Sequence, residues 1–209
     1  LAMAAKAREL KNKGIDIIGL SLGEPDFNTP EFIKDAAIQA VKDNYNSYSP
    51  VDGYADLKEA ICTKFKRDNN LNYSPSQIVV STGAKQSIAN ICMVLLDPGD
   101  EVLLPAPYWV SYSAIATLAE ATSIIIPSSI KTDFKVTPEQ LEAFITPKTK
   151  LVMFNSPNNP SGTIYTEAEY RALGKVLEKY PDIFILSDEI YEHINYGTAH
   201  FSIAAIPEL

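Results

Sequence analysis

The chain has 209 residues, of which 46% are hydrophobic and 21% charged, which is ordinary for a globular protein of one large domain or of a domain and part of another. Its net charge of -8 argues against nucleic acid or an anionic membrane surface as a partner. No apolar run approaches the length of a membrane span and no signal peptide is visible, so we expect a cytoplasmic protein. The cysteines, Cys62 and Cys92, lie in apolar helical patterns and are expected to pack as free thiols.

Helical and strand-like patterns alternate along the first half of the chain. We predict that a helix ends over Lys6–Lys13, that a short strand follows at 15–20, and that a second helix opens at Thr29-Pro30 and runs to about Lys42. We then predict a helix at 53–69, a strand at 78–81 and a helix at 85–96.

The chain has two histidines, His193 and His200, which are too few and too isolated to suggest a metal site.

The second half continues the alternation and shows clearer helix starts. Apolar runs predict strands at 101–104, 122–126, 151–154 and 183–186. Capping boxes at Thr137–Gln140 and Thr166–Glu169 each predict the start of a helix, one before the strand at 151–154 and one after it. This order predicts an α/β fold with three layers, in which a mainly parallel sheet has helices on both faces.

Polar side chains follow two of the predicted strands. The segment NSPNNPSG (Asn155–Gly162) follows the strand at 151–154, and SDEIY (Ser187–Tyr191) follows the strand at 183–186. Ligands of open α/β sheets bind just beyond the carboxyl ends of the strands. There, the carboxylate of Asp188 beside Asn159 and Tyr191 suits a cofactor that carries a basic ring nitrogen and a phenolate oxygen, as pyridoxal phosphate does.

Six motifs in a fixed order give the chain a specific resemblance to a known family. They are GEPDF (23–27), YSPVDGYADLKEAI (48–61), STGAKQ (81–86), PYW (107–109), NSPNNPSG and SDEIYEH (187–193). With them the chain resembles the class I, fold-type I aminotransferases that depend on pyridoxal phosphate, and within these the aspartate aminotransferase branch. The resemblance implies that 1–20 form the N-terminal part of a small domain with its connecting segment. It also implies that 21–209 form a large cofactor domain that is incomplete at its C-terminus.

The resemblance also implies where the cofactor phosphate and ring are held. Backbone groups of Gly83, Ala84 and Lys85 hold the phosphate at the start of a helix, where free N–H groups favour an anion. The alternative reading is a plain strand-to-helix turn. Trp109, the only tryptophan, stacks on the pyridine ring, and ordinary core packing is the alternative for it.

The remaining site residues are also assigned by the resemblance. Asp188 pairs with the pyridine nitrogen, while Asn159 and Tyr191 bond to the ring oxygen. On the substrate side, Gly23 approaches the carboxylate, with Trp109 and Asn159 alongside. Tyr48 reaches the cofactor phosphate of the other subunit, so the resemblance implies a homodimer. Two X–Pro bonds are expected to be cis, Ala106-Pro107, which would orient Trp109, and Asn159-Pro160, which would orient Asn159.

Lys85 and a missing lysine define the expected substrate and the extent of the site. In the branch that the chain resembles, a lysine at this place is associated with acidic substrates, so the resemblance implies aspartate or glutamate as donor and a 2-oxo acid as acceptor. The alternative is that Lys85 balances the phosphate charge or points to water. No lysine follows Asp188, where the family places its Schiff-base lysine, so no catalytic residue is assigned and we expect a fragment that is inactive alone.

Two alternatives to an aspartate-type aminotransferase stay open from the sequence. One is another fold-type I enzyme that uses pyridoxal phosphate, such as a carbon–sulfur lyase. The other is a non-catalytic ligand-binding domain of aminotransferase fold, for which a DNA-binding domain ahead of the fold and loss of the lysine would be diagnostic. The joint presence of Trp109, Asn159, Asp188 and Tyr191 favours intact chemistry.

Overall fold

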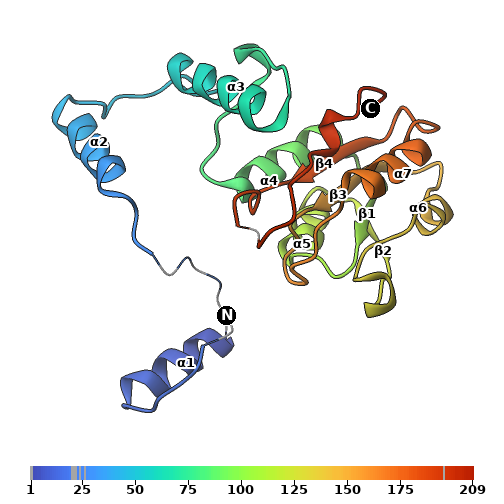
Figure 1. Cartoon of the computed structure of the whole chain (residues 1–209), viewed down its shortest axis with the longest axis horizontal. Coiled ribbons are helices and arrows are strands. Elements are labelled where there is room, and N and C mark those ends of the chain that lie inside the picture. The colour runs from blue at the N-terminus through green and yellow to red at the C-terminus, as the bar shows by residue number, and fades with distance from the viewer. Residues whose placement is uncertain (1, 20–22, 24, 26, 195) are drawn as a thin grey trace. The chain divides into compact units, whose positions relative to one another are not determined.

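The structure is a computed structural model that describes residues 2–19, 23, 25, 27–194 and 196–209. It contains two compact units, Leu1–Tyr48 and Ser49–Leu209. The first unit carries helices α1 (Ala2–Asn12) and α2 (Glu31–Lys42) (Figure 1). The strand predicted at 15–20 is wrong over 15–19, which have no regular structure, and Leu20 lies outside the described residues. In the described part of the chain, no helix is both long enough and apolar enough to cross a membrane.

The second unit is built on a parallel sheet. Its strands are β1 (Glu101–Pro105), β2 (Thr122–Ile126), β3 (Thr149–Asn155) and β4 (Phe184–Asp188), in the order β2-β1-β3-β4. All three neighbouring pairs are parallel, and Asn155 lies opposite Asp188 at the end of the β3–β4 pair. The carboxyl ends of the strands therefore meet at one edge, and the four strands predicted from 101 onward are confirmed.

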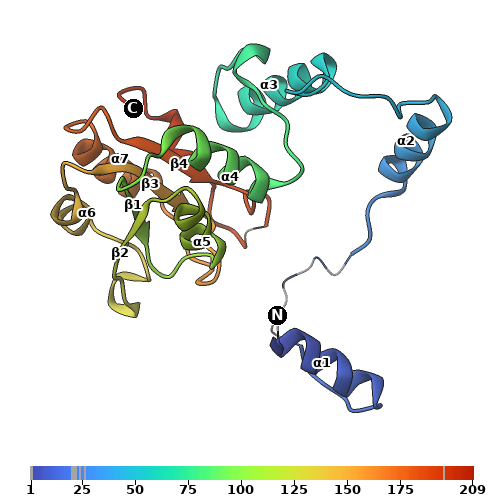
Figure 2. The same ribbon diagram turned by 180° about the vertical axis from the view of Figure 1, so that it is seen from behind.

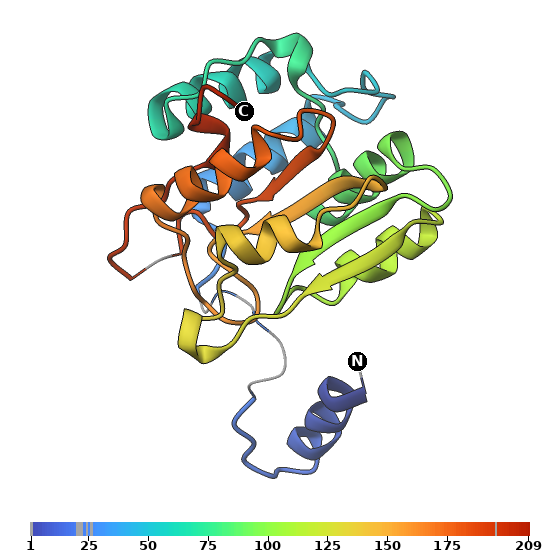
Figure 3. The same cartoon turned by 90° about the vertical axis from the view of Figure 1, so that its right-hand side faces the viewer.

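Helices cover both faces of this sheet, which confirms the three-layer prediction. One face carries α4 (Ala84–Leu95) and α5 (Ser111–Leu118), and the other carries α6 (Pro138–Phe144) and α7 (Glu167–Leu177). Figure 2 brings α4 and α5 in front of the sheet, and Figure 3 shows α6 and α7 on the opposite side. Helix α3 (Ala55–Asn69) and three short 3-10 helices, η1 (Pro75–Gln77), η2 (Ile130–Thr132) and η3 (Ile203–Ala205), complete the described elements of this unit.

The alternation of side chains along each strand creates two hydrophobic cores. In β3, Leu151 and Met153 pack with α4 and α5, whereas Val152 and Phe154 pack with α6 and α7. All four are fully or almost fully buried, which explains why the strand reads as a continuous apolar run. The helix starts follow from side chains as well, because both predicted capping boxes are present at Thr137 and Thr166.

The strand predicted at 78–81 is wrong, because these residues join no ladder in the described part of the chain. The segment instead bonds through the N–H of Val80 to the carbonyl of Asp52, over 3.1 Å. Gly53 makes this approach possible, since a Cβ there would lie 2.5 Å from Val80 Cγ2 and its φ is +100°. Val79 is exposed, so the apolar character of this run does not reflect burial on both sides.

Candidate active site at the carboxyl edge of the sheet

The ends of β3 and β4 are joined by backbone and side-chain bonds around Asp188. Its carbonyl accepts hydrogen bonds from the Asn155 amide group at 2.9 Å and from the Ser156 N–H at 3.2 Å. Asn155 is buried, and as the last residue of β3 it still pairs with Asp188 of β4. The backbone of Asp188 is thus fixed by its neighbouring strand, and its side chain projects from a rigid position.

The Asp188 carboxylate has two described donors. Tyr112 Oη donates to Oδ2 at 2.7 Å, and the N–H of Ile190 donates to Oδ1 at 3.2 Å. Tyr112, from α5, is only 1% exposed. Burial, and then the bond to Asp188, raises the pKa of this phenol, so Tyr112 stays a protonated donor. Tyr112 was not among the site residues predicted from the sequence. A prediction of α5 would have placed Tyr112 in the first turn of a helix, three residues after Trp109.

The side chains of Asn159 and Tyr191, which follow neighbouring strands, lie in contact with each other. Asn159 Nδ2 donates to Tyr191 Oη over 3.2 Å, and the Asn159 N–H donates to Asn155 Oδ1 over 2.7 Å. The loop is attached to the end of β1 as well, because Asn158 Nδ2 donates to the Pro107 carbonyl at 3.3 Å. The expected cis bonds at Ala106-Pro107 and Asn159-Pro160 are present, and Ser156-Pro157 is also cis.

Trp109 links this cluster to the start of α4. The indole packs edge-on against Tyr112, with ring centroids 5.6 Å apart and an interplanar angle of 85°. Lys85 Nζ lies 4.9 Å from the centroid of the indole ring, within the range of a cation–π contact. Trp109 is half-buried, so the ring belongs partly to the core and partly to the open edge of the sheet.

The start of α4 presents backbone donors, as a phosphate site requires. Gly83 precedes the helix with a φ of +83°, and no atom lies within 4 Å of the place where a Cβ would sit. Its own N–H donates to the Ser81 carbonyl at 2.9 Å. The N–H groups of Ala84 and Lys85 have no hydrogen-bond partner among the described residues, which leaves these two for an anion.

Two other predicted site residues belong to the N-terminal unit. Gly23 and Tyr48 are both exposed, and their roles at the site stay predictions. Of the GEPDF motif that supported Gly23, Glu24 and Asp26 lie outside the described residues. Among the residues that the structure describes there is also no group of three or more histidine, cysteine, aspartate or glutamate side chains that could hold a metal ion.

Comparison with known proteins identifies the family. Residues 15–209 match the family described as aminotransferase class I and II, and the chain belongs to this family. It is 53% identical over 194 residues to an aspartate/prephenate aminotransferase of Nitrosomonas europaea, covering 93% of this chain and 49% of that protein. It is 49% identical over 209 residues to an aspartate aminotransferase of Bacillus subtilis, covering 100% of this chain and 53% of that protein.

Solved structures agree with this assignment. The aspartate aminotransferase of Thermus thermophilus with maleate aligns with a TM-score of 0.94 and 40% identity, over 98% of this chain and 53% of that one. The aspartate aminotransferase of Rhizobium meliloti aligns with a TM-score of 0.92 and 45% identity, over 97% of this chain and 51% of that one. The chain therefore spans about half the length of the relatives that it matches.

The residues at the sheet edge fit the cofactor that this family implies, pyridoxal phosphate. Such a ligand needs a carboxylate for the ring nitrogen, donors for the ring oxygen, an aromatic face and amide donors for the phosphate. The described residues offer Asp188, the Asn159–Tyr191 pair, Trp109 and the N–H groups of Ala84 and Lys85.

Proposed function

We propose that this chain supplies most of the pyridoxal-phosphate site of an aminotransferase that moves an amino group between aspartate or glutamate and a 2-oxo acid. The observation that carries the proposal is the carboxylate of Asp188, which is held at the strand edge by Tyr112 and lies in the same turn as Tyr191. When bound, the cofactor supplies an electron-accepting ring for cleavage of a bond at the substrate α-carbon.

Asp188 has the electrostatic role in this proposal. Its carboxylate would pair with the protonated ring nitrogen and keep that proton in place. Because its backbone and its Oδ2 are both held by hydrogen bonds, the charge is in position before the ligand binds. Such preorganisation is the condition under which a charged group contributes most to a reaction.

Asn159 and Tyr191 would donate to the ring oxygen, and Trp109 would stack on the ring. The Asn159–Tyr191 bond keeps the two polar side chains within reach of one ligand atom. The edge-on contact of Trp109 with Tyr112 fixes the plane of the indole relative to Asp188. Ala84 and Lys85 would bind the phosphate through their N–H groups, with Gly83 setting the turn.

We propose aspartate or glutamate as the amino donor because of Lys85. Its ammonium lies against Trp109, at the open edge of the site, where it would meet a side-chain carboxylate of the substrate. The similar proteins named above act on aspartate by their names, and one name adds prephenate, which is itself a dicarboxylic 2-oxo acid.

Several parts of the assembly are proposals for the full-length protein. The Schiff-base lysine is proposed to lie beyond residue 209, since no lysine follows Asp188. A cytoplasmic homodimer is proposed, with Tyr48 reaching the neighbouring cofactor phosphate and Gly23 approaching the substrate carboxylate. The domain boundary near residue 20 likewise stays a proposal. A carbon–sulfur lyase is the second candidate from the sequence, and the similarity to proteins named as aminotransferases favours the aminotransferase.

The experiment that tests the proposal uses the full-length protein. Titration with pyridoxal phosphate should produce a visible absorption band that survives gel filtration. Aspartate or glutamate with 2-oxoglutarate, oxaloacetate or prephenate should then give the transaminated products, and sulfur-containing amino acids should release no thiol or sulfide. Failure to bind the cofactor, or thiol release without amino transfer, would contradict the proposed function.

A further inference from the structure

A second polar cluster lies behind Asp188, on the opposite face of the sheet. Side chains alternate along β4, so Leu186 and Asp188 face α4 and α5, while Ser187 and Glu189 face the other way. Glu189 is the first residue after the strand and stands between Asp188 and Tyr191 in the turn. Its side chain is only 18% exposed. A carboxylate with so little exposure to solvent needs hydrogen-bond donors, and neighbouring side chains provide them.

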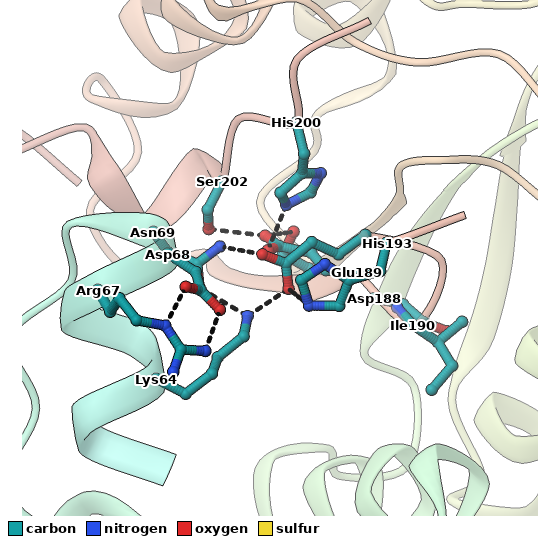
Figure 4. Close-up of polar contacts among 12 residues, drawn as sticks. Lys64, Arg67, Asp68, Asn69, Asp188, Glu189, Ile190, His193, His200 and Ser202 are labelled. Atoms are coloured by element: carbon teal, nitrogen blue, oxygen red, sulfur yellow. Dashed lines mark hydrogen bonds and ion pairs between the residues drawn. The ribbon is translucent and has the colours of Figure 1, made fainter. Parts of the chain in front are cut away.

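Three side chains converge on the Glu189 carboxylate, and two of them, His200 and Ser202, are labelled in Figure 4. Ser187 Oγ and Ser202 Oγ donate to Oε1 at 2.8 and 2.7 Å, and His200 Nε2 lies 2.9 Å from Oε2. The His200 side chain is 8% exposed, and Ser202 is buried at the start of η3. Glu189 therefore ties the end of β4 to a segment more than ten residues later in the chain.

The geometry assigns a direction to each of these bonds. A carboxylate only accepts, so both hydroxyls donate to it, and His200 donates in the tautomer that carries its proton on Nε2. Among the described residues, His200 Nδ1 is buried without a hydrogen-bond partner. A bare ring nitrogen fits that environment better than an N–H, because an unsatisfied donor costs more than an unsatisfied acceptor there.

The same turn holds two of the groups that would touch the cofactor ring, Asp188 and Tyr191. Within it, the N–H of Ile190 donates to Asp188 Oδ1, the N–H of Glu192 donates to the Glu189 carbonyl at 2.9 Å, and the N–H of Ile194 donates to the Tyr191 carbonyl at 2.8 Å. Glu189 is the residue of this turn whose side chain is fixed to η3. Movement at Glu189 would shift Asp188 on one side and Tyr191 on the other.

We propose that Glu189 is a positioning residue, which acts through Ser187, His200 and Ser202 to hold Asp188 and Tyr191 at the geometry that the cofactor ring requires. The proposal rests on the proposed function for its reaction. It adds a role for a cluster that touches neither cofactor nor substrate. Side chains that support a catalytic group in this way determine how accurately it is placed.

The first test measures the cofactor spectrum of the full-length protein in the variant Glu189→Gln. If Asp188 and Tyr191 are held less firmly, their interactions with the cofactor ring become weaker. The midpoint pH of the change in the absorption band of the bound cofactor should then rise by roughly half a unit or more. Ser202→Ala, which removes one donor to Glu189 together with the bond that Ser202 accepts from the Ala204 N–H at 3.3 Å, should shift this pH in the same direction by less. An unchanged pH in both variants would overturn the proposal.

A second measurement needs no cofactor. In the apoprotein, hydrogen exchange of the amides at 188–192 should be about tenfold faster in Glu189→Gln than in the wild type, because the turn loses its attachment to η3. Nitrogen-15 spectra of the wild-type apoprotein should show His200 with its proton on Nε2. Exchange rates equal to those of the wild type would also overturn the proposal.

Glu169→Gln is the matched control for a general loss of stability. Glu169 also accepts several bonds, from Lys135 Nζ at 2.7 Å and from Thr166, but it lies on α7 away from the turn. This variant should lower the unfolding temperature without moving the spectral pH or the exchange at 188–192. If wild-type protein binds no cofactor, the proposed function fails, and the apoprotein measurements still decide whether Glu189 holds the turn.

Discussion

The Tyr112 hydroxyl donates to Asp188 Oδ2 across 2.7 Å, although the two residues are 76 positions apart in the chain. The bond joins α5 to the end of β4 and therefore crosses from one layer of the fold to another. Because burial raises the pKa of Tyr112, its proton stays on the phenol and the direction of the bond does not reverse at neutral pH.

We predict that Tyr112→Phe in the full-length enzyme lowers kcat/KM for the amino donor by roughly tenfold, the usual effect of losing one hydrogen bond to a charged group. The fold should survive, because the ring and its contact with Trp109 are kept. Tyr165→Phe is the matched control, since its hydroxyl accepts from the Val136 N–H at 2.9 Å in the other core. Equal losses of activity in both variants would show that Tyr112 acts only through stability.

Asp188→Ala should slow the reaction far more than it weakens cofactor binding. Losing a charge aimed at the reacting system typically costs a factor of roughly 10² to 10³ in rate. The phosphate contacts at Ala84 and Lys85 lie on another element and should keep the cofactor bound. Steady-state rates and a cofactor titration by absorbance measure the two effects separately. Turnover close to the wild-type value would remove Asp188 from its proposed role.

Lys85→Ala should raise KM for aspartate and glutamate and leave alanine and aromatic substrates nearly unchanged, because only the acidic substrates lose a charge partner. Lys150→Ala is the control, since Lys150 Nζ also lies over an aromatic ring, at 5.4 Å from the centroid of Phe184. If Lys85→Ala weakens acidic and neutral substrates equally, the ammonium serves the cofactor instead of the substrate side chain.

Glu192 should contribute to stability above the acid range and lose that contribution as the pH falls. Burial opposes its ionisation, but bonds from Lys64 and from Asn69, the latter at 2.7 Å, prevail and lower its pKa below 4.5. A carboxyl group whose pKa is lower in the folded state than in the unfolded state stabilises the fold at pH values above its unfolded-state pKa. This contribution is lost as the pH falls through the folded-state pKa. Glu192→Gln should therefore be less stable at neutral pH.

The same variant should also show a flatter loss of stability on acidification. Urea unfolding of the wild type and of Glu192→Gln at several pH values measures the difference. Parallel curves down to the lowest pH at which the protein folds would rule out an ion pair between Glu192 and Lys64 as the source of the effect.

Sequence patterns predicted most of the sheet, because buried parallel strands leave unbroken apolar runs such as 151–154 and 183–186. They missed α5, which starts at Ser111 and has no side-chain cap because its N-cap residue is Val110, and with it the bond from Tyr112 to Asp188. The run at 78–81 looked like a strand because it is apolar, but strands need partners that local sequence does not reveal. The Glu189 cluster could not be predicted either, since His200 is an isolated histidine in the sequence and nothing near it in the chain indicates its partner.

The opposed directions of Asp188 and Glu189 restrict how the length of this chain can vary over evolution. One residue inserted or deleted within β4 would exchange the faces, turning Glu189 or Ser187 toward Tyr112 and Asp188 toward η3. Substitutions at single positions would be tolerated more readily than such a shift. We therefore expect related sequences to keep the spacing from Phe184 to Tyr191 without gaps, and to place insertions after Ile194, ahead of the segment that carries His200 and Ser202.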